Sequence, residues 1–372
     1  MKVTIERAAF LKALNHVQSV VERRNTIPIL SNVLLQADGG QIKLTATDLD
    51  IEVVETVPAD IAQGGATTAP AHMMHDIVRK LPDGAQLEIE QGPDEGRIAI
   101  FAGRSRFALQ ALPPEEFPDL AAGELANRFT VPAAEFKRLI EKTRFAISTE
   151  ETRYYLNGIY LHAVGEGDAA MLRAVATDGH RLAQVQVPLP EGAAGMPGVI
   201  VPRKTVLEVH RLIEDSDDAL EIALSSSKIR FGFDGIVLTS KLIDGTFPDY
   251  ERVIPKDNDK SMEVDTRLFA QAVDRVSTIS SEKGRAVKLH ISPERVVLTV
   301  NNPDSGSAEE EVAATYDGEP LDIGFNARYL LDITNQFGGD TARFSLADAG
   351  SPTIVSDAGD ETALYVLMPM RV

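Results

Sequence analysis

The chain has 372 residues, of which 44% are hydrophobic and 25% are charged, the balance of a folded globular protein. Its 37 basic and 56 acidic residues leave a formal net charge of −19, which as an average argues against a nucleic-acid partner. The absence of cysteine excludes disulfides, thiolate catalysis and cysteine-ligated zinc. Neither an apolar signal region nor a run of membrane-spanning length occurs, so we expect a cytoplasmic protein.

A strand–helix pattern occurs three times along the chain. In each copy a strand residue lies five positions before a phenylalanine, and the pairs are Ile5 and Phe10, Val131 and Phe136, and Val264 and Phe269. A second helix is predicted later in each copy, over residues 70–81, 202–213 and 326–337. The sequence therefore predicts three tandem copies of one structural unit.

Alternating apolar and polar runs around these helices predict strands, and Asp38-Gly39-Gly40 and Ser292-Pro293-Glu294 predict hairpin turns. The motif Ala46-Thr47-Asp48 recurs 130 residues later at Asp178, and Phe117-Pro118-Asp119 recurs with the same displacement at Asp249. The repeats predict three tandem α+β domains of about 125 residues, each with two helices and roughly eight strands. We expect linkers near residues 121–127 and 255–260, and domains at 1–127, 128–256 and 257–372.

The sequence contains no complete set of catalytic residues that we can identify. It has no phosphate-binding loop, nucleophile elbow or His-Glu-x-x-His motif. His72 and His75 could bind a metal from one helix face, although two polar residues on an exposed face are the simpler interpretation. Asp178 beside His180 could be an acid–base pair, or the segment could be a tight turn that presents His180 and Arg181. The matching turn Asp48-Leu49-Asp50 has no histidine, which favours a binding role. No cofactor or metal is expected.

The chain ends on a nearly unbroken apolar run from Tyr365 to Val372. Residues up to Met368 are predicted to complete a buried strand. Met370 and Val372, beyond Pro369, are not explained by that strand, and exposed methionine beside a groove suits adaptable binding of apolar peptides.

Several runs together resemble the bacterial β sliding clamp family. They are Pro28-Ile29-Leu30, Gly103-Arg104-Ser105-Arg106-Phe107, Arg153-Tyr154-Tyr155-Leu156-Asn157-Gly158, Ala176-Thr177-Asp178-Gly179-His180-Arg181-Leu182, Val201-Pro202-Arg203-Lys204 and Met368-Pro369-Met370-Arg371. The resemblance covers the whole chain in the family's order. It implies a three-domain, two-sheet α+β fold that closes head to tail as a homodimeric ring, with helices lining the hole.

The resemblance also reconciles an acidic chain with DNA, because basic side chains would face the hole and acidic ones the outside. On the first helix of the second copy, Phe136, Leu139 and Ile140 form an apolar face, and Lys137, Arg138 and Lys142 are expected to face phosphates. Family likeness gives these DNA-facing candidates: Arg24, His72, Glu150, Tyr154, Tyr155, Arg203 and Lys204. His72 and Glu150 depart from the family pattern, which has a basic residue and an amide there. Strand alternation would turn one of Tyr154 and Tyr155 inward.

A cleft for short apolar peptides is implied between the second and third domains. Its residues are Leu156, Thr177, Gly179, His180, Arg181, Leu182, Pro248, Arg252, Val253, Asn326, Tyr329, Val366, Leu367, Met368, Pro369, Met370, Arg371 and Val372. Gly284 replaces an aromatic residue of the family pattern, so we expect a more open rim.

The dimer contact implied by the resemblance pairs a strand of the first domain with the third domain of a second copy. Its residues are Arg104, Arg106, Phe107, Leu109, Ile279, Glu309 and Glu310, although Phe107 could equally be ordinary core. The implied function is a non-catalytic processivity factor. Its partners would be duplex DNA without sequence preference, the replicative polymerase, the clamp loader, translesion polymerases, mismatch-repair proteins and ligase, with no membrane.

Two other classes of protein stay open on the sequence alone. One is an enzyme that uses Asp178 and His180, and the other is a scaffold that binds proteins without encircling DNA.

Overall fold

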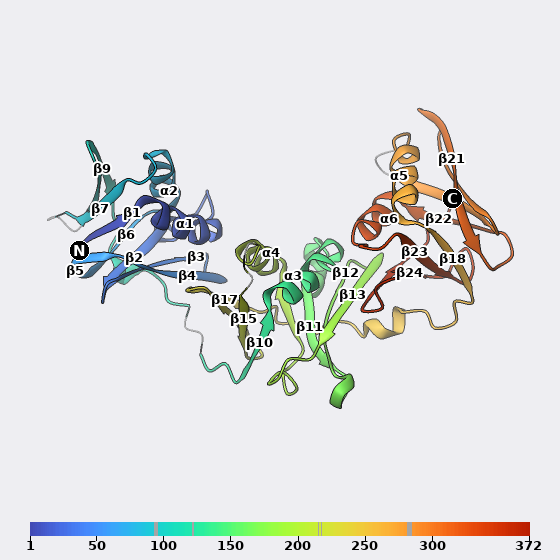
Figure 1. Ribbon diagram of the computed structural model, residues 1–372, viewed down its shortest axis with the longest axis horizontal. Coiled ribbons are helices and arrows are strands. Elements are labelled where there is room, and N and C mark those ends of the chain that lie inside the picture. The colour runs from blue at the N-terminus through green and yellow to red at the C-terminus, as the bar shows by residue number, and fades with distance from the viewer. Residues whose placement is uncertain (93–95, 121–122, 215, 217, 281–284) are drawn as a thin grey trace. The chain divides into compact units, whose positions relative to one another are not determined.

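The computed structural model describes residues 1–92, 96–120, 123–214, 216, 218–280 and 285–372. Within these residues it contains six α-helices and 25 strands (Figure 1). Residues 121 and 122 of the first expected linker lie outside the described residues. Among the described residues, no helix is both long and apolar enough to cross a membrane.

The threefold strand–helix repeat is confirmed. The opening pairs are β1 (Lys2–Glu6) with α1 (Arg7–Val17), β10 (Asn127–Pro132) with α3 (Ala133–Glu141), and β18 (Lys260–Asp265) with α5 (Thr266–Ser277). The second helices are α2 (Ala71–Lys80), α4 (Arg203–Leu212) and α6 (Ala327–Thr334). The phenylalanines shared by the copies, Phe10, Phe136 and Phe269, are all buried, because each points from the first helix into the core of its copy.

Local capping explains where three of these helices begin. The carboxylate of Glu6 accepts a hydrogen bond from the amide of Ala9, and Asp265 accepts one from Leu268 in the same way. At α6 the side chain of Asn326 accepts from the amides of Arg328 and Tyr329. Such caps satisfy amides that have no partner within the first helical turn.

The three copies contain nine, eight and eight strands among the described residues, close to the predicted number. The remaining strands of the first copy are β2 (Asn32–Asp38), β3 (Gln41–Thr47), β4 (Ile51–Pro58), β5 (Asp60–Gln63), β6 (Gly65–Pro70), β7 (Gln86–Gln91), β8 (Arg97–Ala102) and β9 (Ser105–Gln110). Those of the second are β11 (Gly158–Val164), β12 (Met171–Thr177), β13 (Arg181–Pro188), β14 (Val199–Pro202), β15 (Ala219–Leu224), β16 (Lys228–Phe233) and β17 (Ile236–Lys241). Those of the third are β19 (Ala286–Ser292), β20 (Arg295–Asn302), β21 (Gly306–Tyr316), β22 (Leu321–Asn326), β23 (Thr341–Leu346), β24 (Thr353–Asp357) and β25 (Ala363–Leu367).

The two predicted hairpins are present. Gly39 and Gly40 join β2 to β3 with φ values of 57° and 80°, a conformation that glycine adopts without strain. Pro293 and Glu294 join β19 to β20. Gly158, at the start of β11, has a different role, because a Cβ atom there would overlap the carbonyl oxygen of Val201 on β14.

The chain folds as two compact units whose boundary runs through the middle copy. The first unit contains Met1–Phe136, Pro190–Pro197 and Lys204–Leu242, and the second contains Lys137–Leu189, Gly198–Arg203 and Ile243–Val372. In the first unit α1 lies beside α2 and packs on β3 and β4, and in the second α5 lies beside α6 and packs on β20 and β21 (Figure 1).

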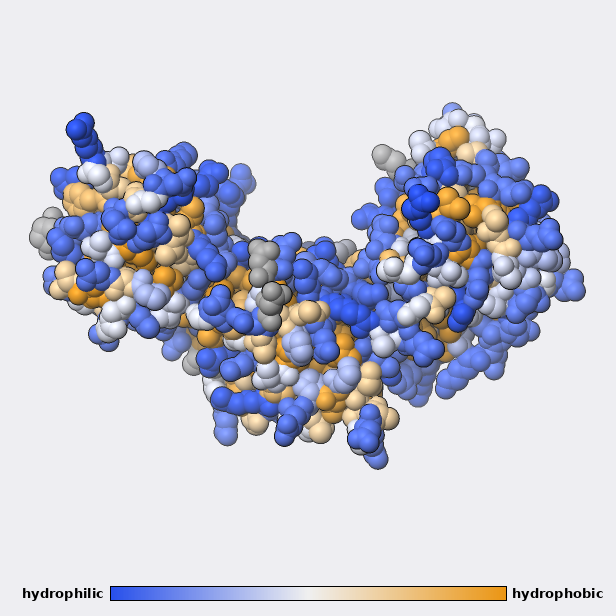
Figure 2. Space-filling view, viewed as in Figure 1, coloured by the Kyte–Doolittle hydropathy of each residue, from blue (hydrophilic) through white to orange (hydrophobic). Residues whose placement is uncertain are grey.

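Within each unit a sheet continues from one copy of the repeat into the next. The first unit has an eight-stranded sheet of order β10-β15-β16-β17-β4-β3-β2-β6, and the second has a twelve-stranded sheet of order β14-β11-β12-β13-β25-β24-β23-β18-β21-β20-β19-β22. The joining pairs, β17 with β4 and β25 with β13, are both antiparallel. We call these two strand pairs the seams. The face of the molecule that Figure 2 shows is mainly hydrophilic, with smaller hydrophobic areas.

Candidate functional site

The turn that carries Gly179 and His180 has the same hydrogen bonds as its counterpart in the first copy. The hydroxyl of Thr177 donates to the carbonyl of Arg181 at 2.7 Å, and the hydroxyl of Thr47 donates to that of Ile51 at 2.8 Å. Asp178 and Asp48 each accept from the two amides that close their turn. The turn interpretation is therefore confirmed, because threonine and aspartate set its geometry in both copies and His180 does not.

Arg181 is buried and has every partner that a buried cation needs. Its guanidinium donates to Asp178 at 3.1 Å, to Asp332 of α6 at 2.6 Å and to the carbonyl oxygen of Phe145 at 2.7 Å. It also lies over the ring of Tyr329, 4.2 Å from the centroid. Because paired charges inside a protein are costly to separate, Arg181 fixes the turn against α6.

The carboxylate of Asp178 is committed to this turn and to Arg181. The ring of His180 instead stacks on that of Tyr329, with centroids 6.3 Å apart. This geometry supports a binding surface made by His180 and Tyr329 in preference to an Asp178–His180 acid–base pair.

The floor of the predicted cleft is apolar and lies in the second unit. Leu156, Leu182 and Val366 are buried in one cluster with Phe247 and Tyr250 of the segment that follows β17. Val253 and Met368, which lie close to Tyr250 and Val366 along the chain, are exposed apolar side chains, with 50% and 40% of their surface accessible.

The chain end is tied to the cleft by two backbone hydrogen bonds. The amide of Met368 donates to the carbonyl of His180 at 3.0 Å, and that of Met370 donates to Gly324 on β22 at 2.7 Å. Tyr365 to Leu367 form the buried strand that the sequence predicted, whereas Met368 is exposed. These contacts and the stacking of His180 on Tyr329 bring the Asp178 turn, Tyr329 and the tail together. Pro248, Arg252, Arg371 and Val372 are exposed.

Tyr154 and Tyr155 do not lie on a strand, and that prediction was wrong. They belong to a 3-10 helical turn, η5 (Glu151–Leu156), in which the amide of Asn157 donates back to the carbonyl of Tyr154. The rings meet edge to face at 5.7 Å. Tyr154 is 53% exposed and Tyr155 packs against the apolar cluster, so one ring does point inward.

Glu150 is held by Arg153, a residue that the sequence prediction did not select. Two hydrogen bonds of 2.9 and 2.7 Å join them, and hydrogen bonding to Arg153 lowers the pKa of the Glu150 carboxyl. Arg153 also donates to the carbonyl of Asp178 and lies so close to Gly179 that a Cβ atom there would overlap the guanidinium. The only feature of the sequence that could have pointed to Arg153 as a site residue is its position directly before Tyr154 and Tyr155.

His72 has both ring nitrogens engaged. Nδ1 lies 2.9 Å from Oε1 of Gln18, and Nε2 lies 2.8 Å from the carbonyl oxygen of Val21. His72 therefore ties α2 to the segment after α1, which argues against a DNA contact by this ring. His75 contacts Asn15. Among the described residues no group of three or more histidine, aspartate or glutamate side chains is arranged to hold a metal.

The basic face expected on α3 is partly occupied by an acid. Arg138 and Lys142 donate to the carboxylate of Asp360 at 2.7 and 3.0 Å. Burial raises the pKa of Asp360, but hydrogen bonds from Thr362, Arg138 and Lys142 outweigh it and hold the pKa below its usual range. Arg138 of α3 and Lys142, which follows that helix, are therefore bound to the turn before β25, which argues against a role for them in contacting phosphates.

The other expected DNA contacts differ in accessibility. Arg24 and Arg203 are exposed. Lys204 is bonded to Asp48 and lies 3.4 Å from Glu22. Its charge is therefore largely balanced in this structure.

The predicted dimer residues lie on two strand edges, one in each unit. β9 is the last strand of a five-stranded sheet, β5-β1-β7-β8-β9, and carries exposed Arg106, partly buried Phe107 and buried Leu109. The hairpin before it carries exposed Arg104. In the other unit, Glu309 and Glu310 lie on the half of β21 that pairs with β20 alone, and Glu310 accepts from Arg275 at 3.0 Å. Ile279 follows α5 and is partly buried.

Gly284, expected at the cleft rim, lies outside the described residues.

Three tandem copies of a two-helix domain, joined by sheets that continue from one copy into the next, define the sliding-clamp class of protein. The matching family descriptions are DNA polymerase III beta subunit, N-terminal domain over residues 1–121, central domain over 130–249 and C-terminal domain over 251–371. The chain therefore belongs to the DNA polymerase III beta subunit family, the beta sliding clamps. Its role is that of a processivity factor, and it is not the catalytic subunit.

Individual relatives agree with this assignment over the whole chain. The chain is 58% identical to the beta sliding clamp of Caulobacter vibrioides and 42% identical to that of Escherichia coli, with both chains fully covered in each comparison. The crystal structure of the Caulobacter crescentus clamp matches with a TM-score of 0.98 at 58% identity, covering 100% of this chain and 99% of that one. The Bartonella birtlesii clamp bound to griselimycin matches with a TM-score of 0.97 at 54% identity and full coverage of both chains.

A layer of aromatic side chains in the second unit contains a histidine, His162, whose charged form is disfavoured. The hydroxyl of Tyr250 accepts from Arg173 at 2.9 Å and lies 3.0 Å from Nε2 of His162, within hydrogen-bonding distance. The His162 ring stacks on Tyr160 at 4.3 Å. Burial and the nearby Arg173 cation lower the pKa of His162 from 6.5 to about 4.

We predict that the free energy of unfolding falls as the pH drops from 6.5 to 4, because the unfolded chain takes up a proton on residue 162 and the folded chain does not. The contribution of this group is at most about 3 kcal/mol. His162→Phe keeps the stacking and removes this contribution, which denaturant unfolding at a series of pH values would measure. His290→Gln, on an exposed histidine, is the control that should keep the dependence. An identical pH dependence in wild type and His162→Phe would contradict the prediction.

Proposed function

We propose that two copies of this chain close head to tail into a ring that encircles duplex DNA and tethers the replicative polymerase. The observation that carries this proposal is the repeated seam. β4, β13 and β21 are corresponding strands of the three copies, as are β17, β25 and β9. Within the chain β17 pairs with β4 and β25 with β13, which leaves β9 and β21 as the pair that a second copy would complete.

The internal seams also predict the register of this third pair. Leu238 lies opposite Val53 in one seam, and Tyr365 lies opposite Ala183 in the other. Carried over through the repeat, the pattern places Phe107 opposite Ala308 of the second copy, again a larger side chain opposite a smaller one. The same register places Arg106 opposite Glu309, so that opposite charges meet on the outer face.

Closure by this pair would use two different edges of each chain, and a heterologous contact of that kind gives a ring when its rotation closes. Exposed cations such as Arg24 and Arg203 are proposed to contact phosphates, which carry no sequence information, so that the ring can slide. The net negative charge of the chain does not prevent these contacts with DNA. At physiological salt, screening limits the electrostatic repulsion from distant acidic residues to a range of roughly 8 Å.

The cleft around His180, Tyr329 and Met368 is proposed to take short apolar segments of partner proteins. The partners would be the polymerase catalytic subunit, the clamp loader, translesion polymerases, mismatch-repair proteins and ligase, and these would compete because they share one site. We propose domain limits of 1–127, 128–256 and 257–372, and a cytoplasmic location.

We predict that the loaded protein stays on nicked circular duplex DNA and leaves once the circle is cut. The reason is topological, since a closed ring can escape only over an end. Retention after gel filtration should be at least tenfold higher on the circle. A scaffold that binds DNA without encircling it would show equal retention on both forms, which would refute the ring.

Reversing one charge of the proposed β9–β21 pair should weaken the dimer. With two joints in each ring and up to about 1 kcal/mol for each cross-strand pair, Arg106→Glu should raise the dimer dissociation constant about tenfold. Adding Glu309→Arg should restore it, whereas adding Glu311→Arg, which shifts the partner charge along the strand, should not. Analytical ultracentrifugation would follow the species at twice the chain mass of 40.3 kDa. Equal rescue by both substitutions would show that the register is wrong.

Deleting residues 368–372 should abolish binding of a polymerase-derived peptide and leave the dimer intact, because the deletion removes no residue of β9, β21 or β25. Fluorescence anisotropy with a labelled peptide measures the loss. Leu268→Ala, which removes an exposed leucine from α5, is the matched control and should bind normally. Unchanged affinity after the deletion would refute the assignment of the tail to the cleft.

A further inference from the structure

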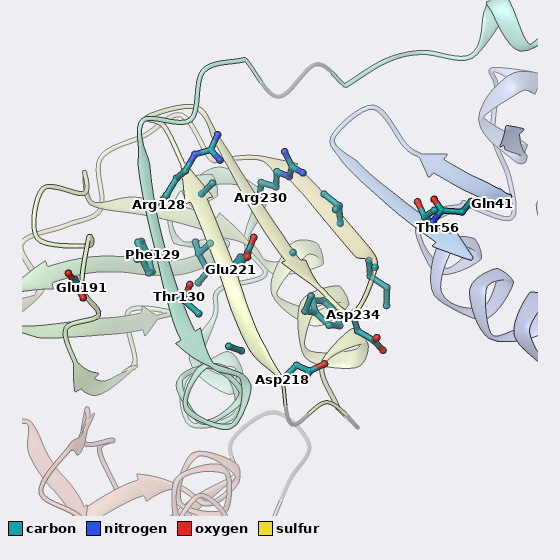
Figure 3. Close-up of a pocket in the computed structure, with 18 residues that line it drawn as sticks. Gln41, Thr56, Arg128, Phe129, Thr130, Glu191, Asp218, Glu221, Arg230 and Asp234 are labelled. Carbon is teal, nitrogen blue, oxygen red and sulfur yellow. The ribbon is translucent and has the colours of Figure 1, made fainter. Parts of the chain in front are cut away.

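The first unit carries a trough on its eight-stranded sheet, and none of the residues that line it belongs to the proposed cleft, DNA contacts or dimer contact. The trough has a volume of about 1310 Å³ and lies over β10, β15 and β16, with Gln41 and Thr56 at its far side (Figure 3). In Figure 3 the side chains of Arg128 and Arg230 project on the same side near one end, and Asp218 and Asp234 lie toward the other end.

Three directly paired residues form a row across the basic end of the trough. Arg128 pairs with Ala223, and Ala223 pairs with Arg230. Residues directly opposite in antiparallel strands point to the same face, so two guanidinium groups flank one methyl group. Their Cα atoms are two strand spacings apart, about 10 Å. The floor beside this row is Gly232, where an added Cβ atom would meet only the Glu221 side chain, at 3.9 Å.

The other two copies of the repeat do not have this row. In the first copy the corresponding residues are Lys2, Glu90 and Ala99, and Lys2 is bonded to Glu88 and Glu90. In the third copy they are Ser261, Ser345 and Ile354. The fold therefore does not require arginine at either position.

The two arginines have little within the chain to neutralise them. Among the described residues neither forms an ion pair, and the one side-chain hydrogen bond is from Arg128 to the carbonyl oxygen of Leu125, at 3.4 Å. The acids that line the trough are Glu221, one row away, with Glu191, Asp218 and Asp234 beyond it. The chain has a net charge of −19, so this pair of exposed arginines forms a locally basic site on an acidic protein.

We propose that this trough binds an extended acidic segment of a partner protein, with a carboxylate between Arg128 and Arg230. Arginine binds carboxylates through paired hydrogen bonds, so the position between Arg128 and Arg230 should be specific for a carboxylate. The small floor at Ala223 and Gly232 leaves space for a peptide backbone. A basic residue four positions along the segment, about 13 Å away in an extended chain, would lie near Asp218 and Asp234.

A nucleic acid fits this arrangement less well. Its phosphates would continue past the arginines to Asp218 and Asp234, where like charges repel. A peptide can change the sign of its charge along the trough, and a phosphate backbone cannot.

The probe is a fluorescein-labelled peptide, Gly-Glu-Glu-Ala-Val-Ala-Lys-Gly, and binding to the full-length dimer is followed by fluorescence anisotropy. Arg128→Glu with Arg230→Glu should weaken binding at least tenfold. The matched control, Arg97→Glu with Lys80→Glu, makes the same change of charge on exposed cations elsewhere and should leave the affinity within twofold.

Gly232→Phe tests the same site by filling the floor without changing the charge. The first copy has Phe101 at the corresponding position, so the strand accommodates an aromatic side chain. This variant should also weaken binding at least tenfold, with thermal unfolding unchanged. The proposal is overturned if wild type does not bind the peptide, if either trough variant binds like wild type, or if oligothymidylate binds wild type more tightly than the peptide. Self-association of wild type that the trough variants abolish would assign the surface to a second copy and would also overturn it.

Discussion

The structure depends on one interaction, the antiparallel pairing of the last strand of each copy with the third hairpin strand of the copy before it. At the β17–β4 and β25–β13 seams this pairing converts separate two-helix domains into continuous sheets. Edge strands left unpaired are prone to join other chains, and each seam removes two such edges. Because the chain has three copies and two seams, one edge of each kind is left over, and in the proposed ring a second copy would supply the missing partners.

The seam between the second and third copies also makes the proposed partner site. β13 begins at Arg181, immediately after the Asp178 turn, and β25 leads directly into the tail from Met368. Arg181 then joins the turn to Asp332 of α6, so the two walls of the cleft come from different copies. The first seam has the same turn at Asp48, but there Lys204 bonds to that aspartate and no apolar tail follows. The two seams thus share the geometry of the turn, and a few side chains that differ between the copies distinguish the second seam from the first.

Sequence reasoning succeeded where the signal is local and periodic. The helices near Phe10, Phe136 and Phe269, the hairpins and the Thr-Asp turns are fixed by spacing, capping and turn residues, and the structure confirms them. It did not predict hydrogen bonds between side chains and residues far away along the chain. Asp360 holds Arg138 and Lys142 from more than two hundred positions away, and Val21 and Gln18 hold His72. Tyr154 was misplaced because a short 3-10 turn has no periodicity of its own.

The sequence by itself determined the threefold repeat, the two helices of each copy, the turn at Asp178 and the apolar strand at the chain end, because these follow from local chemistry and from comparing one copy with another. Only the tertiary structure decided which charges are available. Lys142 is bonded to Asp360 and Lys204 to Asp48, while Arg128 and Arg230 are left beside a small residue. The reason is physical: whether a cation is free depends on the distance to an acid in space, and separation along the chain does not report that distance.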